Sequence, residues 1–234
     1  MLKITTQQMS AAHGLKNLVP NVTIKGKVLE RTSSFKLLGI WINEHLKWTE
    51  HIKYVSSSCY AVLTTLRKLK NLAPLNVRKQ LAESLVLSKL DYNDIVFHPL
   101  PQYQQKKLQR IQNAAASFVL NKYTTETDAV QHLKWLPVKE RTEYHLLRLG
   151  HKSLWDPLFP DYLKLEKRQV HCQLRSSSAA NLVTPFEKGT FQDNCSKIFN
   201  ELPIITKNNS DFKSFTKQEY KTLMNKAKHR LQIP

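Results

Sequence analysis

The sequence predicts a mainly α-helical fold, with a short N-terminal β-hairpin followed by a helical bundle and a smaller C-terminal helical region. The 234 residues include only five glycines, well below the usual share of about 7%. Folds made only of strands need glycine and proline at their tight turns, so this composition favours helices. From Trp48 onward, apolar residues recur every three or four positions, which is the period of an α-helix.

Strand-forming residues are concentrated before this change of period. Val22, Ile24 and Val28 flank a turn at residues 25–27, whose central residue is a glycine. An apolar run rich in strand formers follows at residues 35–42. We expect two or three short antiparallel strands in this part of the chain.

The helices are predicted from apolar periodicity and from prolines that interrupt it. Pro74, Pro99, Pro101 and Pro137 separate successive periodic segments, and proline is tolerated at a helix start but not in its interior. The expected helices cover residues 49–70, 77–97, 102–120, 127–133, 138–155, 193–201 and 210–231.

These signals divide the chain into three parts. Residues 1–46 hold the strands, and residues 47–122 are expected to form a compact bundle of three helices with short connections. Residues 123–234 form the C-terminal helical region, in which a stretch at about 156–192 contains prolines, a serine run and a glycine turn and is expected to be mostly loop.

The charge is strongly positive and unevenly distributed. The chain has 36 Lys and Arg against 18 Asp and Glu, a net charge of +18. Residues 45–122 hold 12 basic against 4 acidic residues, residues 123–158 hold five of each, and residues 159–234 hold 13 against 7. A localised excess predicts a polyanion partner at the bundle and not at the adjacent segment, with nucleic acid as the first candidate and an anionic membrane as the second. A protein that is basic without such a partner stays an alternative.

Cysteine usage and hydropathy predict an intracellular protein, nuclear or cytoplasmic. Cys59, Cys172 and Cys195 are too few and too far apart for a disulfide framework. No apolar stretch approaches the roughly 20 residues that span a bilayer, and the first residues lack a secretory apolar segment.

A search for catalytic or metal-binding patterns finds only weak candidates. Asp91 and Asp94 lie three positions apart and could share a metal ion, but acidic residues on a helix surface usually pair with a neighbouring cation. His45 and His51 are six apart, which does not match the four-residue spacing of a zinc helix. The serine run 176–178 after Arg175 could bind a phosphate or could be a solvated linker.

Several short stretches of the sequence occur in a specific order along the chain. Each stretch by itself is a weak signal of relationship, but their order together is specific. The series consists of FKLLGIWI at 35–42, LKW at 46–48, HI at 51–52, LDY at 90–92, LQRIQN at 108–113, WLPV at 135–138 with Arg141 and Tyr144, LRSS at 174–177, and FNELP at 199–203 with Phe212 and Phe215. In this order it resembles the end of the palm and the thumb of reverse transcriptases from non-LTR (LINE-like) retrotransposons.

The resemblance implies that residues 1–46 are a remnant of the palm and that residues 47–122 are a thumb-like bundle. Phe35, Leu38 and Gly39 match the primer grip, the β-hairpin that holds the primer end in that family. The implied partner is an RNA or DNA template–primer, contacted through phosphates by the basic residues of the bundle. These residues are Lys47, Lys53, Arg67, Lys68, Lys70, Lys106, Lys107 and Arg110.

The resemblance also implies that no catalytic residue lies in this chain. The family's polymerase motif ends in two adjacent aspartates that hold Mg²⁺, and the sequence contains no Asp-Asp pair. We therefore expect no enzyme activity of this chain alone, no metal and no other cofactor in it, with Mg²⁺ only in a complete polymerase. The alternative is a decayed or repurposed helical module that binds a protein, with Phe212, Phe215 and Leu223 either docking a partner helix or packing in the core.

Overall fold

The computed structural model describes residues 23–28, 32–168 and 180–233. The chain separates into two compact units, Met1–Tyr54 and Val55–Pro234. The described residues are mainly helical, and short antiparallel hairpins lie near the N-terminus, so the predicted fold class is confirmed.

Two hairpins make up the strands of the first unit. Strand β1 (Thr23–Ile24) pairs with β2 (Lys27–Val28) through a two-residue turn at Lys25 and Gly26, both with positive φ. Strand β3 (Ser34–Leu37) pairs with β4 (Ile40–Asn43), and Phe35 lies opposite Ile42. The turn residues Leu38 and Gly39 also have positive φ, as two-residue hairpin turns require. The apolar run at 35–42 is therefore folded back on itself.

Within the first unit, the second hairpin lies against the start of helix α1 (Thr49–Arg67). The backbone amide of Trp41 donates to Nδ1 of His51 at 3.5 Å, and the rings of Trp41 and Tyr54 meet edge to face with centroids 6.5 Å apart. The ammonium group of Lys36 lies 4.5 Å from the centroid of the Tyr54 ring. These contacts hold β3 and β4 on the first two turns of the helix.

Most other helices of the second unit lie close to their predicted positions. The bounds of α4 (Gln102–Leu120) and α6 (Val138–Trp155) agree with the predicted ranges, and those of α7 (Phe191–Asn200) and α9 (Phe212–Arg230) lie within two residues of them. The helices of this unit after α1 are α2 (Leu75–Ala82), η1 (Glu83–Leu87), α3 (Ser88–Asp91), α4 (Gln102–Leu120), α5 (Glu126–Asp128), η2 (Ala129–Leu133), α6 (Val138–Trp155), η3 (Asp161–Leu163), α7 (Phe191–Asn200), α8 (Ile204–Lys207) and α9 (Phe212–Arg230).

The second predicted helix is wrong at its C-terminal end. The continuous helical segment α2–η1–α3 ends at Asp91 and not at residue 97. Tyr92 leaves the helix with an extended backbone, and Asn93 adopts positive φ. Asn tolerates the left-handed region better than most residues, so Asn93 is a signal for the end of the helix. The apolar residues at 95–97 continue the helical pattern and obscure this signal.

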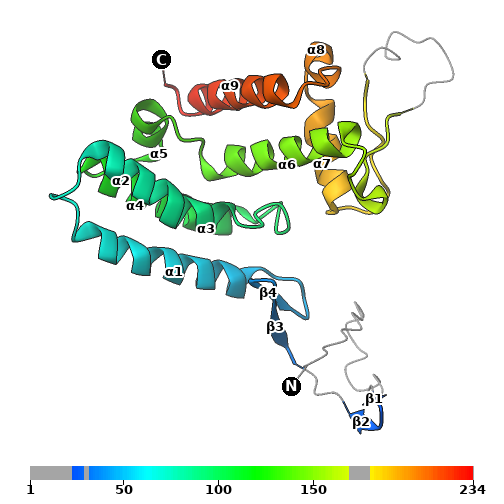
Figure 1. Ribbon diagram of the computed structural model, residues 1–234, viewed down its shortest axis with the longest axis horizontal. Coiled ribbons are helices and arrows are strands. Elements are labelled where there is room, and N and C mark those ends of the chain that lie inside the picture. Colours follow the sequence, from blue (N-terminus) through cyan, green and yellow to red (C-terminus); the bar gives the residue numbers. More distant parts are fainter. Residues whose placement is uncertain (1–22, 29–31, 169–179, 234) are drawn as a thin grey trace. The chain divides into compact units, whose positions relative to one another are not determined.

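Helix α6 lies at the centre of the second unit. It contacts α4, α7 and α9, and Figure 1 shows it between α9 and the helices α2–α4. A buried cluster on this helix joins residues far apart in the sequence, among them Leu146, Phe199 and Phe215. Gly150 allows α7 to approach, because a Cβ there would lie 2.3 Å from Sγ of Cys195.

The first expected helix, residues 49–70, is shorter in the structure. Leu69, an apolar residue near its expected end, follows the end of α1 at Arg67 and is 40% exposed, whereas Leu63 is fully buried in the helix. The loop-rich stretch contains the short helix η3 and a bridge between Lys167 and Leu182. The domain boundary expected at residues 122 and 123 stays a prediction, and residues 55–234 form one compact unit.

Candidate functional site

Three of the predicted phosphate-binding residues form a row on the exposed side of α4, here called the α4 row. It consists of Lys106, Lys107 and Arg110, which occupy neighbouring positions on one helical face and are all exposed. The opposite side of α4 is anchored by buried Leu108 and Ile111. Packing of the apolar face therefore fixes the direction in which the cations project.

The α4 row is free of neutralising acids in the part of the chain that the structure describes. None of its three side chains forms an ion pair there, and α4 itself contains no acidic residue. Tyr103, one turn before Lys106 and Lys107, is 63% exposed and accepts a hydrogen bond from Nε2 of Gln104 at 3.1 Å. The row is thus a compact group of three charges open to solvent, with an aromatic ring at one end.

Arg67, Lys68 and Lys70 lie at the end of α1. Arg67 is the last residue of the helix, and the other two belong to the turn that follows. The carbonyl of Lys70 accepts a hydrogen bond from Nη1 of Arg78 at 3.1 Å. Cations at a helix C-terminus are stabilised by the helix dipole, so this group has a structural role as well as a charge that a phosphate could meet.

The remaining predicted residues belong to the first unit. Lys47 and Lys53 are exposed, and the backbone amide of Lys47 donates to Oδ1 of Asn43 at 2.7 Å. Phe35 is half-buried on β3, while Leu38 and Gly39 form the turn of the hairpin. The three primer-grip-like residues are therefore brought together in one hairpin.

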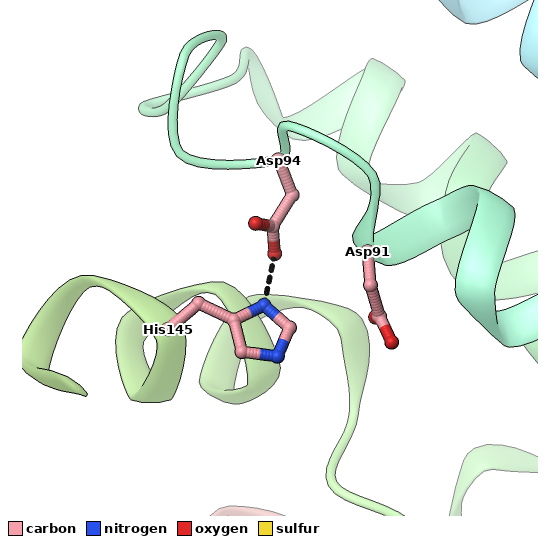
Figure 2. A group of neighbouring side chains, drawn as sticks. All are labelled: Asp91, Asp94 and His145. Carbon is pink, nitrogen blue, oxygen red and sulfur yellow. Dashed lines mark hydrogen bonds and ion pairs between the residues drawn. The ribbon is translucent and has the colours of Figure 1, made fainter. Parts of the chain in front are cut away.

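Asp91 and Asp94 take part in cross-links between the α3 region and α6. Figure 2 shows Asp94 pointing at His145, with Asp91 beside them at the end of α3. Nδ1 of His145 lies 2.8 Å from Oδ2 of Asp94, and Arg141 donates from Nε and Nη2 to the two oxygens of Asp91 at 2.5 and 2.6 Å.

This geometry favours ion pairing over a metal site. Ligand atoms of Asp91, Asp94 and His145 all lie within 4.8 Å of one another. Both oxygens of Asp91, however, already accept from the guanidinium of Arg141, which also places a fixed positive charge where a cation would bind. The cation partner is thus an arginine on α6, which the spacing along one helix could not reveal.

The cysteines that the structure describes are buried and free. Burial raises the pKa of Cys59 to about 11 and that of Cys195 to about 12, so neither is a reactive thiolate at neutral pH. Cys172, the LRSS stretch and the serine run after Arg175 lie outside the described residues.

A second group of cations, which was not predicted from the sequence, lies on α6. Arg148 and Lys152 are exposed and lie over the ring of Phe212 from α9, with distances to the ring centroid of 5.6 Å and 5.5 Å. Equal numbers of basic and acidic residues in 123–158 concealed them. The spacing of the basic residues could have revealed this group. Arg148 lies seven positions after Arg141 and Lys152 four positions after Arg148, so all three share one face of the helix.

Comparison of the chain with protein-family models, with curated proteins and with solved structures gives no match. Among the described residues, every helix is too short or too polar to cross a membrane.

Proposed function

We propose that this chain is the C-terminal part of a non-LTR retrotransposon reverse transcriptase, and that its helical unit binds template–primer nucleic acid without catalysing polymerisation. The family assignment comes from the ordered stretches of sequence, of which FKLLGIWI at 35–42 and LQRIQN at 108–113 are the longest. The binding role is supported chiefly by the α4 row, whose three cations are exposed and have no acidic partner in the described chain.

Phosphates are the chemistry that such a row fits. Lysine is a compact point charge and arginine a planar fork, and both bind phosphate oxygens without distinguishing the bases. A surface of this kind gives weak sequence preference and an affinity that falls steeply with salt. Tyr103 at the end of the row offers an exposed ring next to these charges, as in proteins that combine basic grooves with aromatic side chains.

The described geometry does not favour docking of a partner on the apolar stripe of α9. Phe215 is fully buried and Leu223 is buried in the same cluster, so the helix's own unit already covers them. Phe212 is half-buried beneath Arg148 and Lys152. An interaction module would need a different surface from the one that the apolar pattern suggests.

A filter-binding titration distinguishes nucleic-acid binding from a role in protein binding. The protein is mixed with a labelled RNA–DNA hybrid at low and at moderate salt. We expect saturable retention at low salt that weakens strongly at moderate salt. No retention at low salt would contradict the binding role.

The family assignment has a separate test in genomic DNA. We expect the sequence upstream of the first codon to encode, in the same frame, a palm with the adjacent aspartates, or the decayed remains of one. Unrelated coding sequence in that position would contradict the assignment and would leave the binding test unaffected.

A further inference from the structure

The ion pairs and the unpaired cations of α6 and α9 lie at opposite ends of this antiparallel helix pair. At one end, Arg230 donates to Glu140 at 3.0 Å and Lys226 lies 3.1 Å from Glu143, so that these charges neutralise one another. Near the other end of the pair, Arg148 lies over the ring of Phe212. Lys139 and Arg141 of α6 pair with Glu143 and Asp91, whereas Arg148 and Lys152 form no ion pair in the described chain.

We propose that four of these cations form a second surface that binds the phosphates of a nucleic-acid strand. The α6–α9 surface, as it is named here, consists of Arg148, Lys152, Lys213 and Lys217. All four side chains are exposed, and none forms an ion pair within the described part of the chain. The surface shares no residue with the α4 row, so it goes beyond the function proposed above and can fail independently of it.

Helix geometry and ring contacts place the four cations together. Lys213 follows Phe212, whose ring lies below Arg148 and Lys152. Lys217 and Tyr220 are four and seven positions after Lys213 and therefore share its side of α9. The rings of Tyr220 and Tyr144 meet edge to face with centroids 5.5 Å apart, which joins this side of α9 to α6.

Each helix presents its cations at a regular interval. Arg148 and Lys152 are four residues apart, as are Lys213 and Lys217, and four residues of α-helix advance by about 6 Å. Packed helices lie about 8–10 Å apart, so the four charges form two short parallel rows. An extended chain of phosphates offers charges at comparable intervals, whereas a single small anion would use only one of these positions.

The guanidinium of Arg148 is held in place by aromatic rings. Its Cζ lies 5.5 Å from the centroid of Tyr144 and 5.6 Å from that of Phe212. A stacked arginine keeps its planar fork oriented, and this fork matches two phosphate oxygens. Lysine at this position would keep the charge but lose the fork.

The same surface is poorly suited to a lipid bilayer. A helix that lies on a membrane exposes large apolar side chains beside its cations. Among the described residues of α6 and α9, Trp155 at the end of α6 is the one exposed large apolar residue; it is 38% exposed, and the ammonium group of Lys167 lies 4.3 Å from its ring centroid. Phe212, Tyr144 and Tyr220 are half-buried. The surface therefore offers four cations beside a single partly exposed ring, which favours nucleic acid over a membrane.

The test compares Lys213→Gln/Lys217→Gln with a control that loses the same charge. The control is Lys122→Gln/Lys164→Gln, whose lysines pair with Asp128 and Asp161; Lys122 is exposed and Lys164 is half-buried. Fluorescence anisotropy with a labelled single strand and with its duplex gives the affinity at about 0.1 M salt. Since each phosphate contact contributes close to tenfold under these conditions, we expect the first variant to bind at least tenfold more weakly than the control.

A second variant, Arg148→Lys, tests the oriented fork. We expect weaker binding with an unchanged slope of log affinity against log salt, because the charge is kept. The inference is overturned if the lysine pair binds as well as the control, or if the pair loses binding to phosphatidylserine vesicles but not to oligonucleotides. Loss of binding that is confined to α4-row variants would also overturn it, while supporting the function proposed above.

Discussion

Arg141 on α6 and Asp91 at the end of α3 are joined by two hydrogen bonds, although they lie 50 positions apart in the sequence. Both side chains are largely buried, so the pair is only partly screened by water. Beside it, His145 and Asp94 form a second link between the same segments. Asp91 and Asp94, which could have suggested a metal site, therefore link the α3 region to α6 through hydrogen bonds.

Asp91→Asn should lower the stability of the protein. The substitution keeps the shape of the side chain but removes the charge and one of the two acceptors of Arg141. Hydrogen bonds between charged groups contribute about 1.5–3 kcal/mol each, so we expect a loss of about 2 kcal/mol in the free energy of unfolding. Urea unfolding followed by circular dichroism measures it, and a change below about 0.5 kcal/mol would contradict the structural role.

Gly150→Ala should be strongly destabilising because of Cys195. The added methyl group would lie 2.3 Å from the buried sulfur, which is closer than any real contact. Overpacking of this kind costs about 1–3 kcal/mol. The double variant Gly150→Ala/Cys195→Ala removes the clashing sulfur and should recover part of the loss. If the two substitutions were simply additive in thermal unfolding, the close approach of α6 and α7 would be wrong.

The helices that the sequence predicted best are those with clear local signals at both ends. Helix α4 begins after Pro101 and ends at Leu120, before Asn121 with its positive φ, and its bounds were predicted to the residue. Helix α6 follows Pro137 in the same way. The end of α3 was missed because the apolar residues after Asn93 continue a helical pattern while the chain turns to bring Asp94 to His145.

The candidate site was predictable only where it depends on one helix. The α4 row follows from spacing alone, and its exposure follows from the apolar positions of the same helix. The partner of Asp91 and the distribution of charge on α6 depend on which helices pack together. The composition of a segment counts the charges on all faces of a helix together, so it cannot show this distribution. For this reason a segment with five basic and five acidic residues concealed exposed Arg148 and Lys152.

Glu219 should make the stability depend on pH. This carboxyl group is 1% exposed on α9, both its oxygens lack a hydrogen-bond partner in the described chain, and burial raises its pKa from 4.5 to about 7. The folded protein then binds more protons than the unfolded chain between these values. Its contribution is fully present below pH 4.5 and is lost as the pH rises to about 7, by about 3 kcal/mol in total.

The variant Glu219→Gln isolates this effect. It cannot ionise, so the difference in unfolding free energy between wild type and variant should change across this pH range in the direction given. Urea titrations at several pH values between 4 and 8 measure the difference. A constant difference would show that the carboxyl group is not buried without a partner.

The chain alone should not extend a primer. Two-metal polymerisation requires adjacent carboxylates that hold Mg²⁺, and the sequence has no Asp-Asp pair. A primer-extension reaction with Mg²⁺ and all nucleotides should show no product at protein concentrations that saturate the template–primer. Product that disappears in an Asp91→Asn/Asp94→Asn variant would contradict this prediction and would make these two acids catalytic.

The salt dependence of nucleic-acid binding, measured for wild type and for Lys106→Glu/Lys107→Glu/Arg110→Glu, tests the central proposal most directly. Each phosphate contact contributes close to one unit to the slope of log affinity against log salt. We predict that reversing the α4 row makes the slope shallower by about two to three units and weakens binding of an RNA–DNA hybrid at every salt concentration. An unchanged slope and affinity in a folded variant would contradict the assignment of α4 as a nucleic-acid-binding helix.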